Sequence, residues 1–257
     1  MKTTIIGSGN VATVMGGAIA AAGHIIGQVV ARNEPAAAAL AAEWGCGYAT
    51  RWEAVDPAAD LYIVSLSDRA LEEVNRRLSL PHRLVVHTAG AAPLSALSGV
   101  SQRHGVLYPL QSLRKEIRPF PEFPLLVDAA RAEDEILLEG FARTISGQVQ
   151  HADDAMRLKL HVAAIFANNF TNHLYSLAAD FCRAGGIDFS LLLPLIHETA
   201  RRVERYPPRD VQTGPAIRGD RTTMDRHLEA LGNYHNMSEL YRLFSDKIAE
   251  YYKEGRG

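Results

Sequence analysis

The chain has 257 residues, of which 47% are hydrophobic and 22% are charged, and its formal net charge is −2. A chain of this length suits one large or two small domains and carries ample apolar material for a core. The nearly balanced charge provides no field for nucleic acid or for a membrane surface, so we expect a small-molecule partner. Cys46 and Cys182 lie far apart in the sequence, so neither a disulfide framework nor a metal-binding spacing emerges, and a cytoplasmic location is expected.

The first residues predict neither a targeting segment nor a membrane span. Met1 and Lys2 lead directly into an apolar strand, which is not the pattern of a signal peptide. The apolar stretch 11–22 is too short and too rich in glycine to cross a bilayer. We therefore expect no membrane partner.

A glycine-rich turn follows the first predicted strand, residues 4–6. Residues 7–12 read GSGNVA, and a helix comes next, which is the G-x-G-x-x-G/A pattern of dinucleotide-binding folds. The first glycine permits a tight turn, the second lets the backbone approach a pyrophosphate, and the helix N-terminus offers free N–H groups to phosphates. The alternative is a glycine-rich turn without a ligand. The residues predicted to bind the cofactor here are Gly7, Ser8, Gly9, Asn10 and Val11.

The end of the second predicted strand, residues 24–30, bears on the choice between NADP and NAD. NAD sites usually carry Asp or Glu about 20 residues past the glycines, where the carboxylate binds the ribose 2′-OH. This strand instead closes on Arg32 and Asn33, and a guanidinium can pair bidentately with a 2′-phosphate. A solvated surface arginine is the simpler alternative, and Glu34 could serve a ribose. The pattern favours NADP.

The chain then alternates helices and strands up to residue 152, which predicts a doubly wound, mostly parallel Rossmann sheet over residues 1–152. Three prolines make the segment 119–124 an extended connection. The predicted strands are 61–66, 83–88, 105–108, 125–127 and 147–151, and the predicted helices are 35–44, 69–78 and 131–145.

Ligands of such a sheet bind beyond the carboxyl ends of its strands. This rule nominates Leu66 and Ser67 after one strand, Ala89 and Gly90 after the next, and residues 108–111 at the end of a third. The small Ala89-Gly90 pair suits the approach of a flat nicotinamide ring, although it could be a plain strand-to-helix turn. His87 either points into the crevice or satisfies a backbone carbonyl, and we favour the structural role.

The pattern beyond residue 152 is helical, which predicts an all-α domain over residues 153–257. One long helix is expected from 153 to about 183, and its middle is apolar nearly all round and should be buried on most sides. His161, Asn168 and Asn172 stand at i, i+7 and i+11, so they share one stripe of a straight helix. Buried polar groups need partners, so this stripe either faces a ligand or forms a polar seam between helices.

A long loop separates a second helix, predicted over 189–206, from a third over 221–231. It holds the segment TGPAIRGD, in which Arg218 could clamp an anionic group, although the loop could equally brace the last two helices. Asp220 is a natural N-cap for the third helix, and Gly185-Gly186 would end the long helix. A final helix is predicted over 237–250.

Five segments together resemble a known family: IIGSGNVA, VVHTAGA, GVLYPLQS, KLHVAAIFANNF and TGPAIRGD. The chain is similar to proteins that join a Rossmann-like NADP-binding domain to a helical domain of unknown function, DUF2520. The fold also resembles pyrroline-5-carboxylate reductase, ketopantoate reductase and the 6-phosphogluconate dehydrogenase group. The resemblance implies an oxidoreductase that binds a small molecule between its two domains.

Two departures from these relatives limit what the resemblance implies about catalysis. Many relatives read HPLQ where this chain has Tyr108 and the residues after it, so no catalytic histidine is transferred to that position. Lys159 is followed four residues later by Ala163, so the Lys/Asn dyad of the hydroxyacid dehydrogenases is absent as well.

The function predicted from the sequence is an NADP(H)-dependent oxidoreductase that reduces a C=O or C=N bond. His161 is the expected general acid, because hydride addition leaves an anion that needs a proton and imidazole groups titrate near neutral pH. Asn168 and Asn172 would bind the substrate, and Arg218 would meet a carboxylate. The alternatives are a non-catalytic NADP-binding regulator and an NADP reductase that uses the deazaflavin F420.

A homodimer is the expected assembly. The long apolar helix cannot be covered by its own Rossmann domain and three shorter helices alone. Pairing with the same helix of a second subunit about a two-fold axis would bury it.

Overall fold

The computed structural model describes residues 1–253, which divide into two compact units, residues 1–170 and residues 171–253. The sheet ends at residue 151, one residue before the domain boundary predicted from the sequence. The first compact unit continues beyond that point through the first turns of the long helical segment.

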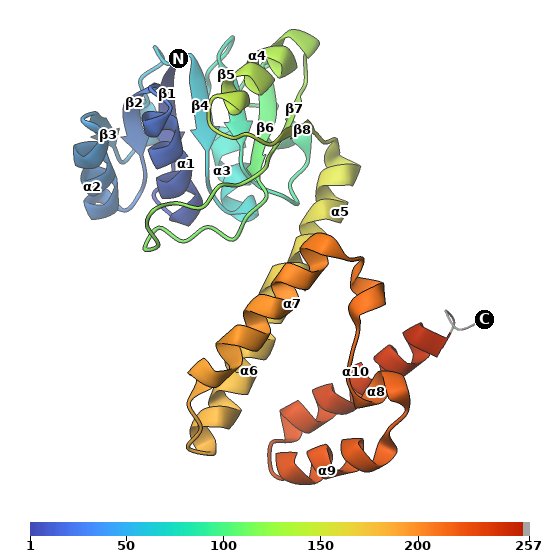
Figure 1. Cartoon of the computed structure of the whole chain (residues 1–257). Helices are drawn as coiled ribbons and strands as arrows, with labels where there is room; N and C mark the ends of the chain where they lie inside the picture. The colour runs from blue at the N-terminus through green and yellow to red at the C-terminus, as the bar shows by residue number, and fades with distance from the viewer. Residues whose placement is uncertain (254–257) are drawn as a thin grey trace. The chain divides into compact units, whose positions relative to one another are not determined.

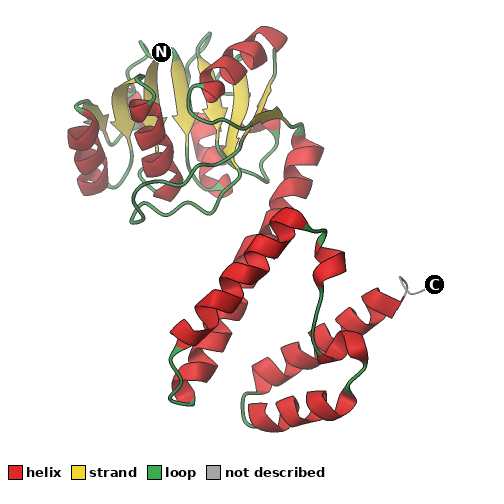
Figure 2. Ribbon diagram, in the orientation of Figure 1, coloured by secondary structure: helices red, strands yellow, loops and turns green. Residues whose placement is uncertain are grey.

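The N-terminal unit is built on one sheet, whose strands follow the order β3-β2-β1-β4-β5-β6-β7-β8 over the described residues (Figures 1 and 2). Neighbouring strands are parallel except β6 and β7, which are antiparallel. The predicted doubly wound, mostly parallel sheet is therefore confirmed. The strands are β1 Lys2–Ile6, β2 Ile25–Val30, β3 Gly47–Ala49, β4 Leu61–Val64, β5 Leu84–His87, β6 His104–Pro109, β7 Leu125–Ala129 and β8 Val149–His151.

Helices cover both faces of this sheet. Met15 and Ile19 of one helix and Leu138 of another pack on one face, and Leu71 and Val74 pack on the other. The central strands are buried on both sides, which explains why they read as continuous apolar runs. The elements are α1 Asn10–Ala21, α2 Glu34–Trp44, α3 Asp68–Arg77 and α4 Ala132–Arg143, with short 3₁₀ turns η1 Trp52–Ala54 and η2 Leu94–Leu97.

The prediction of a single straight helix after the sheet is wrong in one respect. The helix begins as α5, Asp154–Ala164, but residues Ile165–Phe170 (η3) form a π-helix before α6, Thr171–Ala184, continues it. A π-helix winds with i→i+5 hydrogen bonds, so the i, i+7, i+11 stripe does not extend through it unchanged. Such segments are rare and occur frequently at functional sites.

The predicted burial of this helical segment is not achieved by the N-terminal unit. Leu158, Val162, Phe166 and Phe170 all stay exposed within that unit, and Phe166 keeps 66% of its surface. The rings of Phe166 and Phe170 contact each other edge-on, with centroids 5.0 Å apart. The apolar pattern of this segment predicts burial, but the N-terminal unit does not bury these side chains.

The C-terminal unit is all helical in its described part, as predicted. Asp220 caps α9, Arg221–Leu231, by accepting the backbone N–H of Thr223 at 3.1 Å, and Gly186, with φ 68°, follows α6. No helix in the described part is long and apolar enough to cross a membrane. After α6, the elements are η4 Phe189–Leu192, α7 Leu193–Arg205, η5 Pro208–Val211, α8 Pro215–Arg218, α9 Arg221–Leu231 and α10 His235–Lys253.

A fully buried histidine holds the turn that follows β5. The Nε2–H of His87 donates to the carbonyl of Pro93 at 3.1 Å, and its Nδ1 accepts the N–H of Ala89 at 3.2 Å. One nitrogen must therefore donate while the other accepts, which only the neutral ring can do. Burial, with a smaller contribution from the Arg157 charge, lowers the pKa of His87 to about 4. The structural role that the sequence favoured for His87 is what the structure shows.

Because the folded chain resists protonation of His87, the neutral imidazole stabilises the fold fully above the ordinary histidine pKa of 6.5 and progressively less as the pH falls towards about 4. A difference of about 2.5 in pKa corresponds to about 3 kcal/mol. We expect His87→Gln to be less stable than the wild type at pH 7 and the gap to narrow by about this amount at pH 4. Urea unfolding at both pH values measures the gap, and a gap that does not change with pH would contradict the assignment.

Candidate functional site

A cleft of about 560 Å³ lies at the carboxyl ends of β1, β2 and β4. The strand order reverses between β1 and β4, and this switch point is where doubly wound sheets bind their ligands. Nine of the eleven residues predicted from the sequence to bind the cofactor line it: Gly7, Ser8, Gly9, Asn10, Val11, Arg32, Asn33, Leu66 and Ser67.

The backbone of the glycine motif is shaped to accept a pyrophosphate. Gly7 has φ +132°, and a Cβ there would collide with the Ser65 carbonyl oxygen, so the tight turn requires glycine. A Cβ on Gly9 would meet nothing within 4 Å, which leaves open space above the backbone. In the described part of the chain no side chain caps the N-terminus of α1, so its first N–H groups are free to bind an anion.

The wall beyond β2 is suited to a 2′-phosphate. Arg32 lines the cleft with an exposed side chain, whereas the oxygen of Asn33 is used to cap α2 by accepting the N–H of Ala36. Glu34, the residue that could have served a ribose, is hydrogen-bonded by the hydroxyl of Tyr48 at 3.2 Å and does not line the cleft. Within residues 1–253, the only guanidinium on the wall of the cleft thus belongs to Arg32.

Two of the lining residues that the sequence did not predict bring an aromatic ring and a carboxylate to the cleft. Trp52 enters the cleft from the turn after β3, and Glu73 from α3. The strand β3 has only three residues, which is too short for a strand pattern to be recognised, so the aromatic ring after its end could not be predicted.

The second part of the site is a hollow of about 300 Å³ between the end of β6 and the helical segment after the sheet. His161 and Asn168, both predicted from the sequence, line it together with Tyr108. The Tyr108 hydroxyl lies 2.9 Å from His161 Nδ1, and burial raises the pKa of Tyr108, which keeps the phenol protonated at neutral pH. Further lining residues are Leu110, Gln111, Ser112, Ala164, Ile165, Ala167 and Asn169.

The turn after β5 brings Gly90 directly against this pair of rings. A Cβ at position 90 would lie 2.7 Å from His161 Nδ1 and 2.9 Å from Tyr108 Cζ. Thr88 lines the cofactor cleft, two residues before Gly90. The segment from Thr88 through Ala89 to Gly90 therefore connects the cleft to the Tyr108–His161 pair.

A buried arginine fixes the start of α5 to the same turn. Arg157 is 1% exposed, and its guanidinium donates to the Ala92 carbonyl at 2.6 Å and to the Asp154 carboxylate at 2.6 Å. Asp154 in turn accepts the N–H of Leu94 at 2.8 Å. Because His161 stands one helical turn after Arg157, these bonds determine where the imidazole lies.

The other two residues predicted to act on substrate lie in the C-terminal unit. Asn172 is exposed on α6, and Arg218 is exposed at the end of α8, followed by Gly219 in a left-handed conformation. Their roles remain predictions. The sequence places Tyr108 at a strand end, where ligands bind, but indicates no chemical role for its hydroxyl.

Two family models match the chain. One, described as a domain of unknown function (DUF2520), matches residues 123–248, and the other, described as NADP oxidoreductase coenzyme F420-dependent, matches residues 2–90. No curated protein matches the chain. The resemblance seen in the sequence is therefore confirmed over both parts of the chain.

Solved structures extend this result. A Bacteroides fragilis protein designated an NADP oxidoreductase is 40% identical, with a TM-score of 0.91 and coverage of 97% of this chain and 98% of that chain. The reductive aminase of Aspergillus terreus, in complex with NADPH and ethyl-5-oxohexanoate, is 18% identical with a TM-score of 0.70, covering 100% and 95% of the two chains. The 1-pyrroline-5-carboxylate reductase of Streptococcus pyogenes is 17% identical with a TM-score of 0.62, covering 97% and 98%.

The last two likenesses show the fold alone, because their identity to this chain is low. The first relative and the family model of the N-terminal part both point to an oxidoreductase with NADP as its cofactor, and both predictions are confirmed. The chain belongs to the family of NADP oxidoreductases that joins an NADP-binding Rossmann domain to a DUF2520 domain.

Proposed function

We propose that this oxidoreductase reduces a C=O or C=N bond of a small molecule, with His161 as the proton donor and Tyr108 as its hydrogen-bonded partner. The observation that carries the proposal is the contact of both rings with Gly90, on the turn that leads out of the cofactor cleft. This is the position expected for the nicotinamide end of the cofactor.

The chemistry requires a proton donor close to the transferred hydride. NADPH supplies the hydride when it is bound, and the oxygen or nitrogen of the reduced double bond then carries negative charge. His161 donates a proton to that atom, and the Tyr108 hydroxyl orients the ring through Nδ1, which leaves Nε2 for the substrate. Among the described residues, no hydrogen bond engages His161 Nε2.

The cofactor itself is held by four groups of residues. The backbone at Gly7 and Gly9 and the free N-terminus of α1 receive the pyrophosphate, and Arg32 receives the 2′-phosphate. Trp52 offers a flat apolar surface to the adenine ring. Ala89 and Gly90 face the nicotinamide.

The substrate is held by amide side chains in this proposal. Asn168 lines the hollow beside His161. For Asn172 and Arg218, which belong to the C-terminal unit, we keep the roles predicted from the sequence: Asn172 hydrogen-bonds the substrate, and Arg218 pairs with a carboxylate if the substrate carries one. Two structural neighbours, a reductive aminase and a pyrroline-5-carboxylate reductase, carry names that refer to amine formation and to a cyclic imine, which favours C=N over C=O as the first bond to test.

A second candidate function is hydride exchange between NADP and a deazaflavin. It is favoured by the description of the family model that matches residues 2–90, which names coenzyme F420. A panel of cyclic imines, keto acids and F420 offered with NADPH separates the two candidates. Oxidation of NADPH only in the presence of F420 would replace the proposed function, and oxidation with none of the panel would favour a non-catalytic NADP-binding regulator.

We also propose that the protein is a homodimer in the cytoplasm. The N-terminal unit leaves Leu158, Val162, Phe166 and Phe170 exposed along one helical segment, and a second copy of that segment would cover them. Cys46 and Cys182 are both free thiols, which suits a reducing compartment.

Arg32→Ala should lower the affinity for NADPH and leave the affinity for NADH unchanged. Losing charge-assisted hydrogen bonds to a 2′-phosphate costs about 1.5–3 kcal/mol, or roughly 10- to 100-fold in Kd. Titration of NADPH and NADH fluorescence measures both constants. Arg131→Ala is the matched control, because Arg131 pairs with Glu133 and does not line the cleft. An equal loss for both cofactors would contradict the role of Arg32.

His161→Ala should reduce turnover by roughly 100-fold or more while the Kd of NADPH stays unchanged, because the proton donor is lost and the cofactor cleft is intact. Tyr108→Phe should reduce turnover less and shift the pH profile of kcat, because it removes only the hydrogen bond that orients the imidazole. Steady-state kinetics on the best substrate of the panel measures both variants. Wild-type turnover in His161→Ala would remove this residue from catalysis.

Sedimentation at micromolar concentration should give about twice the 28.1 kDa mass of the chain. Phe166→Asp places a charge in the proposed interface and should shift the protein to the monomer, whereas Ile136→Asp, at an exposed position on α4, should not. A wild-type protein that sediments as a monomer would contradict the dimer.

A further inference from the structure

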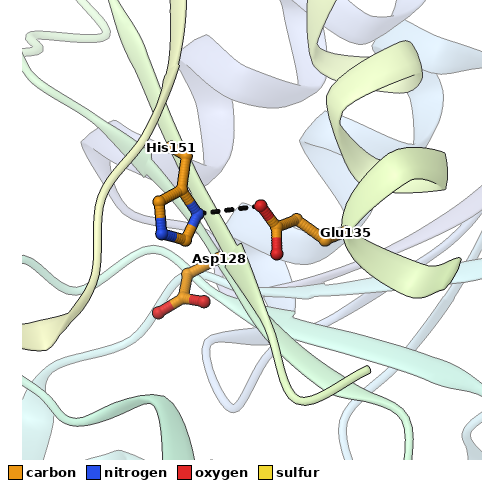
Figure 3. Close-up of side chains that lie close together, drawn as sticks. All are labelled: Asp128, Glu135 and His151. Atoms are coloured by element: carbon orange, nitrogen blue, oxygen red, sulfur yellow. Dashed lines mark ion pairs between the residues drawn. The ribbon is translucent and has the colours of Figure 1, made fainter. Parts of the chain in front are cut away.

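Three side chains that could share a metal ion meet beside the end of the sheet (Figure 3). Asp128 belongs to β7, His151 to the neighbouring β8, and Glu135 to α4. Their ligand atoms all lie within 4.8 Å of one another, and His151 Nδ1 is 2.9 Å from a carboxylate oxygen of Glu135.

The cluster contains a buried carboxylate without a side-chain partner. Asp128 is 7% exposed, and over residues 1–253 no side chain donates a hydrogen bond to its carboxyl group, which has only the backbone N–H of Ala129. An ionised carboxylate in such a place needs a compensating cation. The charges of His151 and, less strongly, of Arg157 act on the Asp128 carboxylate, and the Arg157 guanidinium is already bonded to the carboxylate of Asp154.

We propose that Asp128, Glu135 and His151 bind one divalent transition-metal ion, of which Zn²⁺ is the best match. One imidazole nitrogen and two carboxylates form a mixed ligand set that suits Zn²⁺, whereas Ca²⁺ and Mg²⁺ take oxygen ligands alone. Three protein ligands leave a fourth position of a tetrahedral site for water.

The spacing of the ligand atoms is close to that required. At a metal–ligand distance of about 2.1 Å, two ligands of a tetrahedral ion lie about 3.4 Å apart, so the longest separation in the cluster must shorten by about 1.4 Å at most. Glu135 and His151 can supply this movement, because 33% and 54% of their side chains are exposed to solvent. The same exposure gives the ion a path of entry.

The metal would connect three elements away from the cofactor cleft. Asp128 lies opposite Val106, near the start of β6, because β7 is antiparallel to β6. The cluster therefore lies towards the amino ends of the parallel strands. The cleft lies at the opposite edge, at the carboxyl ends of the parallel strands. We therefore expect the ion to stabilise β8, a three-residue strand at the end of the sheet, rather than to act on the cofactor.

Isothermal titration calorimetry of the chelator-stripped full-length protein tests the site with ZnCl₂ and, separately, MgCl₂. We expect one Zn²⁺ per chain, no measurable Mg²⁺ binding, and a raised thermal midpoint with Zn²⁺. Glu135→Gln and His151→Gln each replace one ligand, and both side chains are partly exposed, so both variants should fold. Each variant should bind Zn²⁺ roughly 10-fold more weakly or worse.

His235→Gln is the matched control, because His235 is an exposed histidine at the start of α10, outside the cluster. The His235→Gln protein should bind Zn²⁺ as tightly as the wild type. Co²⁺ substitution adds a spectroscopic readout, since a tetrahedral site gives visible absorption that His151→Gln should abolish. Wild-type protein that takes up no Zn²⁺, or Glu135→Gln and His151→Gln proteins that bind it as tightly as the wild type, would overturn the proposal.

Discussion

The close packing of Gly90 against two aromatic rings is the constraint on which the site depends. A single methyl group at this position would approach His161 Nδ1 to 2.7 Å, so the Tyr108–His161 pair can rest on the turn only because residue 90 has no side chain. This turn begins just after Thr88, which lines the cofactor cleft. One missing Cβ thus lets the end of the cofactor site and the candidate proton donor come together.

Two buried polar side chains, His87 and Arg157, fix the turn that carries Gly90 through hydrogen bonds to its backbone. His87 bonds to both ends of the turn, to the N–H of Ala89 and the carbonyl of Pro93, and Arg157 reaches the carbonyl of Ala92 from the first turns of α5. Neither side chain faces the cofactor cleft, and both are nearly inaccessible to solvent. Their cost of burial is offset because almost every polar atom is paired, the Nε of Arg157 being the exception.

The parts of the fold that rest on local chemistry could be predicted from the sequence. The glycine motif, the buried strands and the Asp220 cap each follow from the conformations that a few neighbouring residues permit. The parts that depend on distant pairing could not. Tyr108 gains its role only from a histidine 53 residues later in the chain. The π-helix at Ile165–Phe170 has no signature in an apolar stretch that suits an ordinary helix equally well.

The candidate site shows the same division between local and distant information. Nine predicted cofactor residues lie together in one cleft, because the position of a ligand at strand ends follows from the topology of the sheet. Trp52 was missed because its strand has three residues, and the cluster of Asp128, Glu135 and His151 was missed because its spacing in sequence matches no metal-binding pattern. Only the pairing of β7 with β8 and the packing of α4 reveal it.

The central claim is that the nicotinamide ring lies over Ala89 and Gly90, next to His161. A crystal structure of the complex with NADP⁺ tests it most directly. The substrate must lie between the hydride donor and the proton donor, so the account predicts that the nicotinamide C4 atom lies about 6 Å from the His161 imidazole, with the space between them open to substrate. A nicotinamide ring directed away from Gly90, with C4 more than about 10 Å from His161, would contradict the account.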